Sequence, residues 1–257
     1  MFPIYIPSKG RPKCLTAKLL SGLNYYVVVE PQDADAYAGL PLVVLPANNQ
    51  GIGYSRNWIK SYSANLGEKY HWQIDDDMKS FCSRVPGKPF VGNISPELAL
   101  MEAELLVAKY CNIGELGIDC NAWPPPEDYL SINKQPHQCI LINNDTKSNF
   151  RSEFNPVEDL DFTLQVLTEG WCTILMNHLR TCSVSATSGK LRGKIIEYDV
   201  ESLNAYRIKV RMKMEKLCAA WPSLPLSVKM TNDGRPQIRR GKKVWAAFKQ
   251  RPLPSKK

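Results

Sequence analysis

Six short apolar runs recur along the first two thirds of the chain, and most are continuous rather than alternating with polar residues. They are residues 3–6, 25–29, 42–45, 70–74, 139–142 and 171–176. A strand that is apolar on both faces is buried between two layers, as in parallel sheets covered by helices. Helical patterns lie between these runs at residues 54–66, 96–111 and 159–167, the second with Ser95 as N-cap. This alternation predicts an α/β fold with a Rossmann-type, mostly parallel sheet sandwiched by helices.

Two segments interrupt the alternation. Residues 119–138 are rich in proline, with three consecutive prolines at 124–126, and are too long for a simple connection. Long loops in compact domains usually cover or frame a site, and we expect the same here. Residues 198–217 carry apolar side chains on one face and basic ones elsewhere, which predicts an amphipathic basic helix.

Positive charge is concentrated at the C-terminal end. Residues 229–257 contain ten Lys or Arg and one Asp, whereas the other 228 residues contain 23 basic and 24 acidic side chains. A neutral body with a tail of net charge +9 indicates a polyanionic partner such as nucleic acid, which the tail would bind in a salt-sensitive, sequence-independent way. The residues expected to contact it are Arg235, Arg239, Arg240, Lys242 and Lys243. The alternative is a solvated tail without a partner.

Length and cysteine content place the chain in a broad class. Its 257 residues, 44% of them hydrophobic, suffice for one large domain or a domain with an appended subdomain. No apolar run approaches the roughly 18 residues of a membrane span, and the N-terminus lacks the features of a signal peptide. The eight cysteines are scattered without a Cys-x-x-Cys pair, which favours free thiols in a reducing compartment. We therefore expect a cytoplasmic protein without a membrane partner.

Three adjacent carboxylates, Asp75, Asp76 and Asp77, directly follow the apolar run at residues 70–74. Such a cluster repels itself unless a cation binds there, and its hard oxygen ligands suit a divalent metal. A metal at this position most often neutralises a diphosphate. The alternative is a solvated turn or a helix N-cap.

The first two predicted strands also end in polar residues. The first leads into Pro7, Ser8 and Arg11, which would present backbone N–H groups and a guanidinium at the carboxyl edge of the sheet, where open α/β folds bind ligands. The second ends at Glu30, whose carboxylate could accept hydrogen bonds from a ribose or a base. The glycine and lysine spacing is not that of a P-loop, and a plain surface turn is the alternative.

A glycine-containing segment follows the third predicted strand. Gly51 and Gly53 would let the backbone approach a ligand closely, and a helix N-terminus comes next. Arg56 and Asn57 on the first turn of this helix would face the same crevice.

A second acidic cluster, residues 158–161, opens the helix predicted at 159–167. Acids in a first turn often serve only the helix dipole, but a carboxylate near a metal-bound diphosphate could act as general base on an acceptor hydroxyl. Asp159 and Asp161 are the candidates. His178, just after the run at 171–176, is a candidate third metal ligand or acceptor contact, with a structural histidine as the alternative.

The order of these motifs resembles the nucleotide-sugar glycosyltransferases of the GT-A fold. More narrowly, it is similar to the TET/JBP-associated glycosyltransferases, which are found largely in bacteriophages, over roughly residues 3–185. The resemblance implies a GT-A-like catalytic domain over residues 1–190, with a donor half at about 1–80 and an acceptor half at about 81–190. Residues 191–257 would then form a C-terminal helical extension with a basic tail.

On the donor side, the resemblance implies that Pro7, Ser8 and Arg11 line the nucleotide pocket and that Glu30 reaches the uridine or its ribose. Gly53, Arg56 and Asn57 would lie against the nucleotide-sugar, and Asp76 would lie near the ribose or the sugar.

The metal, Mg²⁺ or Mn²⁺, would be bound by Asp77 and Asp75, with His178 as the further candidate, and would bridge the diphosphate. Asp159 is the first choice for the base and Asp161 its rival.

The expected reaction is metal-dependent transfer of a sugar from a UDP-sugar to a 5-hydroxymethylpyrimidine in DNA, in the host cytoplasm if the protein is phage-encoded. Three alternatives remain at this point: a glycosyltransferase with another acceptor, a nucleotidyltransferase, and a non-enzymatic DNA-binding accessory protein. The sugar, the anomeric outcome, the oligomeric state and the choice between hydroxymethylcytosine and hydroxymethyluracil do not follow from the residues. Nor does the way in which the base becomes accessible.

Overall fold

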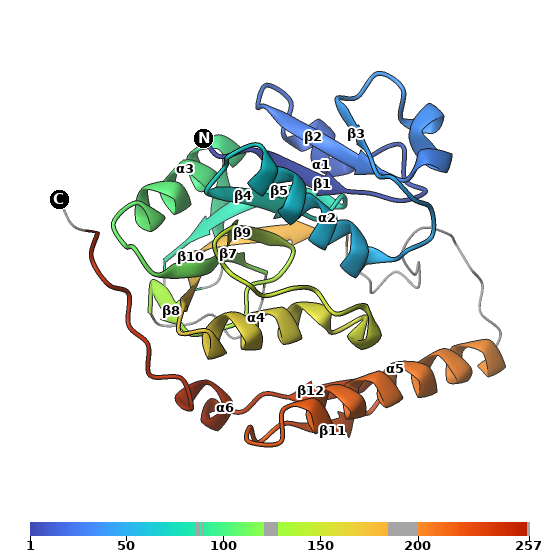
Figure 1. The fold of residues 1–257 in the computed structure, drawn as a ribbon, viewed down its shortest axis with the longest axis vertical. Coiled ribbons are helices and arrows are strands. Elements are labelled where there is room, and N and C mark those ends of the chain that lie inside the picture. The colour runs from blue at the N-terminus through green and yellow to red at the C-terminus, as the bar shows by residue number, and fades with distance from the viewer. Residues whose placement is uncertain (86–87, 89, 121–127, 185–199, 256–257) are drawn as a thin grey trace.

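The computed structural model describes residues 1–85, 88, 90–120, 128–184 and 200–255. Its centre is a ten-stranded sheet with the order β3-β2-β1-β4-β9-β7-β10-β5-β6, to which β8 adds by pairing with β10 (Figure 1). The strands are β1 (Ile4–Pro7), β2 (Tyr25–Val29), β3 (Leu42–Val44), β4 (Tyr70–Ile74), β5 (Met78–Arg84), β6 (Phe90–Ile94), β7 (Ile113–Asp119), β8 (Leu130–Ile132), β9 (Cys139–Asn143) and β10 (Cys172–Ser183).

Most strands of this sheet run in the same direction. The pairings β3-β2-β1-β4 are parallel, and β7 and β10 run the same way because β9 lies antiparallel between β4 and β7. Strand β6 shares this direction, while β5, β8 and β9 run the opposite way. The predicted mostly parallel α/β sheet is therefore confirmed.

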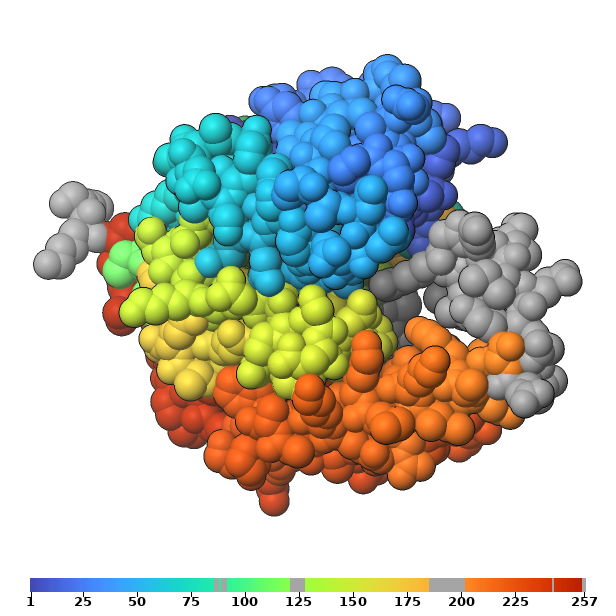
Figure 2. Space-filling view, turned by 45° about the vertical axis from the view of Figure 1, so that its right-hand side comes forward, coloured from blue at the N-terminus to red at the C-terminus, as the bar shows by residue number. Residues whose placement is uncertain are grey.

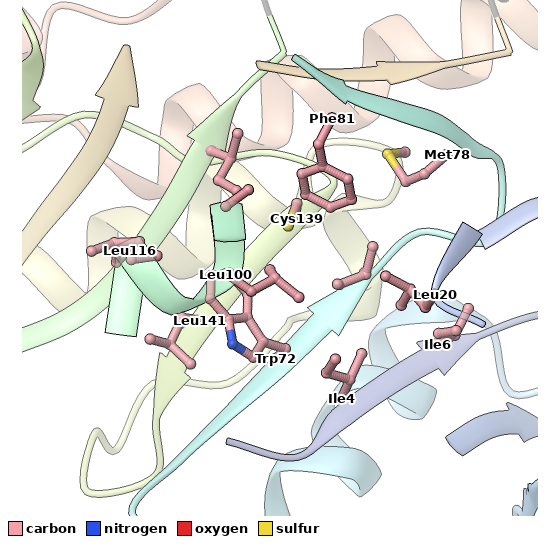
Figure 3. Close-up of a cluster of buried hydrophobic side chains, with 14 of the residues drawn as sticks. Ile4, Ile6, Leu20, Trp72, Met78, Phe81, Leu100, Leu116, Cys139 and Leu141 are labelled. Atoms are coloured by element: carbon pink, nitrogen blue, oxygen red, sulfur yellow. The ribbon is translucent and has the colours of Figure 1, made fainter. Parts of the chain in front are cut away.

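Helices cover both faces of the sheet, as the continuous apolar strands require. The helices of this part of the chain are α1 (Leu15–Leu19), α2 (Ile52–Asn65), α3 (Pro96–Val107) and α4 (Glu158–Thr168), with two short 3₁₀ turns, η1 (Pro31–Tyr37) and η2 (Ser152–Phe154). Alternate residues of β1 show the two layers: Ile4 and Ile6 join the cluster that α1 and α3 cover, whereas Tyr5 joins Ile59 of α2. Figure 3 shows the first cluster around Trp72, Leu100 and Leu141.

The caps and turns follow ordinary chemistry. Ser95 caps α3 by accepting a hydrogen bond from the Leu98 backbone N–H at 3.2 Å, as predicted. The helix ends at Val107, earlier than the predicted residue 111. None of the helices that the structure describes is long and apolar enough to cross a membrane.

The C-terminal extension is folded against the sheet domain. It consists of α5 (Val200–Ala220), a hairpin of β11 (Ser227–Met230) and β12 (Pro236–Arg239), and the short helix α6 (Lys242–Ala246). Phe154, Leu160 and Leu164 form one buried cluster with Leu217 and Val244 of the extension. Figures 1 and 2 show the extension lying against the face formed by α4 and its neighbours.

The last residues run back across the molecule to the end of α3. The Leu253 carbonyl accepts a hydrogen bond from the Cys111 N–H, and the Ser255 N–H donates to the Lys109 carbonyl, both at 2.9 Å. Residues 227–255 therefore pair and pack with the rest of the chain, although most of their side chains are exposed.

Candidate active site

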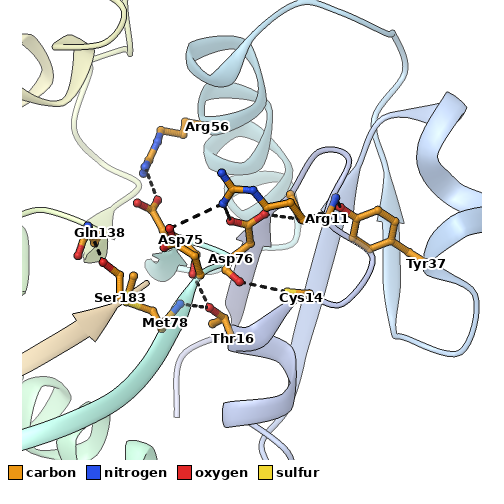
Figure 4. Close-up of polar contacts among 12 residues, drawn as sticks. Arg11, Cys14, Thr16, Tyr37, Arg56, Asp75, Asp76, Met78, Gln138 and Ser183 are labelled. Atoms are coloured by element: carbon orange, nitrogen blue, oxygen red, sulfur yellow. Dashed lines mark hydrogen bonds and ion pairs between the residues drawn. The ribbon is translucent and has the colours of Figure 1, made fainter. Parts of the chain in front are cut away.

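The acidic triplet forms the turn between β4 and β5, at the carboxyl end of β4. Thr16 of α1 holds the turn from below, because its hydroxyl donates to the Asp75 carbonyl at 2.5 Å and accepts from the Met78 N–H at 2.9 Å (Figure 4). The side chains of the triplet therefore lie at the carboxyl edge of the sheet, where the loops after β1, β2 and β3 also begin. This is the edge at which open α/β sheets bind ligands.

Asp76 points back into the protein and is buried. Its carboxylate accepts hydrogen bonds from Ser8 Oγ and from Arg11 Nη1, both at 2.6 Å, and Tyr37 OH in turn contacts Ser8 Oγ at 2.7 Å. Burial raises the pKa of Asp76 above its usual range, although Ser8 and Arg11 favour the charged form. The structure thus brings together Ser8, Arg11 and Asp76, with Pro7 at the end of β1 immediately before them.

Asp75 and Asp77 are more open than Asp76, with side chains 19% and 23% exposed. Arg56 Nη2 contacts Asp75 Oδ1 at 2.8 Å, and Arg11 Nη1 lies 3.8 Å from Asp77 Oδ2. The described residues contain no group of three His, Cys, Asp or Glu side chains placed to hold a metal ion. Two carboxylates nevertheless fit Mg²⁺ or Mn²⁺, because such ions are commonly bound by one or two carboxylates together with substrate phosphates and water.

Glu30 is buried at the end of β2 and is held by polar neighbours. Lys9 Nζ and Gln32 Nε2 each lie 2.7 Å from Glu30 Oε2. Burial would raise the pKa of Glu30, but the hydrogen bonds from Lys9 and Gln32 and the backbone of Asn49 hold it below its usual value. Glu30 is therefore an ionised acceptor at the same sheet edge.

Gly53 and Asn57 serve packing rather than an open crevice. A Cβ atom on Gly53 would lie 2.6 Å from Ser152 Oγ and 3.2 Å from the Phe150 carbonyl oxygen, so α2 approaches η2 closely there. Asn57 exchanges two hydrogen bonds with the backbone of Phe150, at 2.9 and 2.7 Å. Because the protein itself fills the space beside Gly53, we correct the prediction that this glycine admits a ligand.

Arg56, on the same helix, faces a small cavity of about 290 Å³. The residues that line the cavity include Arg56, Asp75, His137, Glu158 and Asp159. It therefore joins the strand-end carboxylates to the first turn of α4, which are more than eighty residues apart in the sequence.

Asp159 is paired with a histidine that the sequence analysis did not select. His137 Nδ1 lies 2.9 Å from Asp159 Oδ2, and the two side chains are each about a quarter exposed, at 26% and 25%. Burial would raise the pKa of Asp159, but the hydrogen bond and charge of His137, with the charge of Arg56, hold it below its usual value. Asp159 is thus an ionised carboxylate that opens onto the cavity.

Asp161 has a different environment, although it lies on the same turn of α4. It is fully buried and accepts hydrogen bonds from Arg151 Nε at 2.7 Å, Gln165 Nε2 at 2.7 Å and Trp221 Nε1 at 2.9 Å, and a second one from Arg151. Trp221 lies just after α5, so Asp161 anchors the C-terminal extension. The surrounding donors occupy its oxygens, and it does not line the cavity described above.

His178 lies away from the acidic triplet. Its Nε2 is 2.6 Å from Glu102 Oε1 on α3, and its Nδ1 contacts the Tyr129 carbonyl oxygen at 3.2 Å. Ser183 pairs with Met78, and His178 precedes Ser183 by five residues on β10. At about 3.4 Å per residue this puts His178 roughly 17 Å along the strand from the triplet. The ring is too distant to bind a metal held by Asp77, which corrects the sequence-based choice.

The basic residues of the extension fall into two groups. Arg239, Arg240 and Lys243 line a second, larger cavity that also contains Asp159. Arg235 is on the hairpin turn and pairs with Asp233 at 2.5 Å, outside this cavity. Lys242 begins α6, and its side chain lies outside the part of the chain that the structure describes.

Comparisons with known proteins identify one family. A family model described as TET-Associated Glycosyltransferase matches residues 2–190. No curated protein matches the chain.

Three similar solved structures are A197 from STIV, a protein of Desulfovibrio desulfuricans G20 named as a nucleotide-diphospho-sugar transferase, and CMP:2-keto-3-deoxy-manno-octonic acid synthetase with CTP. Their sequence identities to this chain are 13%, 8% and 11%, and their TM-scores are 0.41, 0.43 and 0.42. The matches cover 72%, 83% and 68% of this chain and 86%, 99% and 89% of the other chains. These scores are low, and nothing about the substrate of this chain follows from them.

Proposed function

Because the chain belongs to the TET-associated glycosyltransferases, we propose that it transfers a sugar from a UDP-sugar to the hydroxyl group of a 5-hydroxymethylpyrimidine base in DNA. Membership of a glycosyltransferase family is incompatible with the two other classes considered from the sequence, a nucleotidyltransferase and a non-enzymatic DNA-binding protein. The donor, the acceptor and the metal are the parts that this proposal adds.

One observation supports the proposal above the others. A single cavity is lined by Asp75 after β4, Arg56 of α2, His137 before β9 and Asp159 of α4. A glycosyl transfer needs a group that neutralises the leaving diphosphate and a proton acceptor for the attacking hydroxyl.

The donor would bind at the carboxyl edge of β1, β2 and β4. Arg11 and Ser8, fixed by Asp76, and the ionised Glu30 supply donors and acceptors for a nucleotide. Asp77 and Asp75 would hold Mn²⁺ or Mg²⁺, and the bound metal would stabilise the negative charge that develops on the leaving UDP.

Asp159 would act as the general base. The acceptor oxygen forms a bond to the anomeric carbon, the bond from that carbon to the diphosphate oxygen breaks, and UDP leaves with both bonding electrons. The acceptor proton passes to Asp159, which is ionised because His137 and Arg56 stabilise its charge. His137 orients this carboxylate through the 2.9 Å contact to Nδ1.

UDP release from a panel of UDP-sugars with Mn²⁺ tests the proposal, with and without DNA that contains 5-hydroxymethylpyrimidines. The expected result is DNA-stimulated release, a hexose-sized mass gain on the DNA, and loss of both in Asp77→Asn. Asp35→Asn, an exposed carboxylate on η1, is the matched control and should behave as wild type. An equal rate of UDP release with and without DNA would contradict the proposed acceptor. Sugar transfer in the absence of any divalent metal would contradict the role of Asp77.

A further inference from the structure

A cavity of about 870 Å³ lies between the sheet domain and the C-terminal extension. Its inner wall comes from residues 135–137 and 156–160, and its outer wall from the β11–β12 hairpin and the start of α6. Figure 2 shows how closely the extension, in orange, covers the neighbouring surface. The sheet domain alone would therefore leave this wall open.

This cavity adjoins the small cavity in which we place the reaction. His137, Pro156 and Asp159 line both. A group bound in the large cavity can therefore reach Asp159, which also lines the small cavity with Asp75 and Arg56.

The outer wall carries concentrated positive charge. Lys229, Arg239, Arg240 and Lys243 line it, and Asp159 is the sole acidic residue among the lining residues. The Arg240 guanidinium donates a hydrogen bond to Gln135 Oε1 on the inner wall, which ties the two walls together. Arginine and lysine in this arrangement favour a phosphate-bearing ligand.

The other lining residues suit a flat apolar group. Val157, Leu160 and Ile238 are among them. An apolar lining with a few charged groups at one side is typical of a pocket for a small molecule or a single nucleotide, for which volumes of about 300–1,000 Å³ are usual.

The size of the cavity excludes a double helix. A volume of 870 Å³ equals a sphere about 12 Å across, which is no wider than the major groove of B-DNA alone. A base inside a duplex therefore cannot reach Asp159 through this cavity unless its nucleotide leaves the helix.

We propose that this cavity is the acceptor pocket and that it takes one nucleotide flipped out of the DNA. The base lies against the apolar wall with its hydroxymethyl group at Asp159, and the adjoining phosphates contact Arg239, Arg240 and Lys243. This inference rests on the proposed function, and it makes the extension a wall of the active site rather than a tether for DNA.

The first test measures flipping without turnover. Duplex DNA carries 2-aminopurine beside the 5-hydroxymethylpyrimidine, and its fluorescence rises when the neighbouring base leaves the stack. We expect a rise on binding wild-type protein, and a smaller rise at saturating Arg239→Ala/Arg240→Ala. Unchanged fluorescence at saturating protein, alongside normal sugar transfer, would overturn flipping and leave the proposed function intact.

The second test measures kinetics. Each lost contact to a phosphate should raise KM for DNA about 10-fold or more, and the double variant should reduce the slope of log affinity against log salt by roughly 2. The melting temperature of the double variant, compared with that of the wild type, shows whether the variant is folded. Lys249→Ala, an exposed lysine outside the cavity, is the control and should change KM less than 3-fold, by about 0.6 kcal/mol.

A third comparison uses the DNA itself. The free energy needed to unstack a target base is lower when the base is mispaired. A mispaired target base should therefore be a better acceptor than the same base in a matched pair. Equal kcat/KM for both, or equal KM for the double variant and Lys249→Ala, would overturn the pocket. Absence of any transfer to DNA by the wild type would remove the proposed function and the pocket together.

Discussion

Asp161→Asn should destabilise the protein while leaving the chemistry intact, which distinguishes Asp161 from Asp159. The substitution keeps the shape of the side chain but places an NH₂ group where an oxygen accepted hydrogen bonds. Arg151 and Gln165 would then face a donor, and the Arg151–Asp161 ion pair would be lost.

The cost can be worked from the burial of the two partners. Removing one partner of a buried ion pair costs about 3–5 kcal/mol. Asp161 is fully buried, but the Arg151 side chain is 38% exposed, so water can solvate part of the freed guanidinium. We therefore expect the lower end, about 3 kcal/mol, or a fall in melting temperature of roughly 6–12 °C for a chain of this size.

Differential scanning fluorimetry and UDP release, measured side by side, check this expectation. Asp159→Asn is the matched variant two residues away. Its side chain and that of His137 are about a quarter exposed, so the stability loss should stay within about 1 kcal/mol, while kcat falls about 10²–10⁴-fold. An Asp161→Asn protein that melts like wild type and is inactive would refute the reasoning and make Asp161 the base.

Three further predictions follow. The pKa of Asp159 is held below its usual value, so this base loses its charge only as the pH falls through that lowered value, and kcat should be flat from about pH 5 to 8. A rise in kcat within this range in a pH–rate profile would contradict Asp159 as the base. Gly53→Ala should lower the free energy of unfolding, measured by chemical denaturation, by about 1–3 kcal/mol, because the added Cβ would lie 2.6 Å from Ser152 Oγ. An unchanged denaturation midpoint would show that η2 shifts to make room for the methyl group. Mn²⁺ with UDP should raise the melting temperature of the wild type but not of Asp77→Asn, and an equal rise in both would remove Asp77 from the metal site.

Much of the donor side follows from the sequence because it rests on short-range patterns. Continuous apolar runs identify β1, β2, β4 and β9, and a strand end marks the place of the acidic triplet. The rule that parallel strands present their carboxyl ends at one edge then brings Ser8, Arg11 and Asp76 together.

Strands β5 and β7 were not among the predicted strands, because both contain residues that are unusual in a buried strand. β7 contains Glu115, which is buried and accepts a hydrogen bond from Thr163, and two glycines, one of which packs against Pro136. β5 has the sequence MKSFCSR, which is neither a continuous apolar run nor a regular alternation, so neither strand pattern identifies it.

His137 could not be selected from the sequence, because its role depends on its contact with Asp159, which lies 22 residues further along the chain. It lies in a proline-rich segment without periodicity, of which residues 121–127 lie outside the described chain. The extension was predicted as a helix with a basic tail, but its docking on the sheet domain was not, for a similar reason. Its basic residues dominate the composition, whereas Trp221 and Leu217, which dock it, are isolated in the sequence.

The docking of the extension on α4 has a consequence for how such proteins are truncated and compared. Asp159 and Asp161 belong to the same turn, so the residue proposed for proton transfer is two positions from the residue that holds Trp221. A fragment that stops where the family match ends, at residue 190, would uncover Phe154, Leu160 and Leu164 and release the first turn of α4. The boundary at which sequence similarity fades is then not a boundary of folding, and segments grafted between relatives at this point would have to carry their own α4 with them.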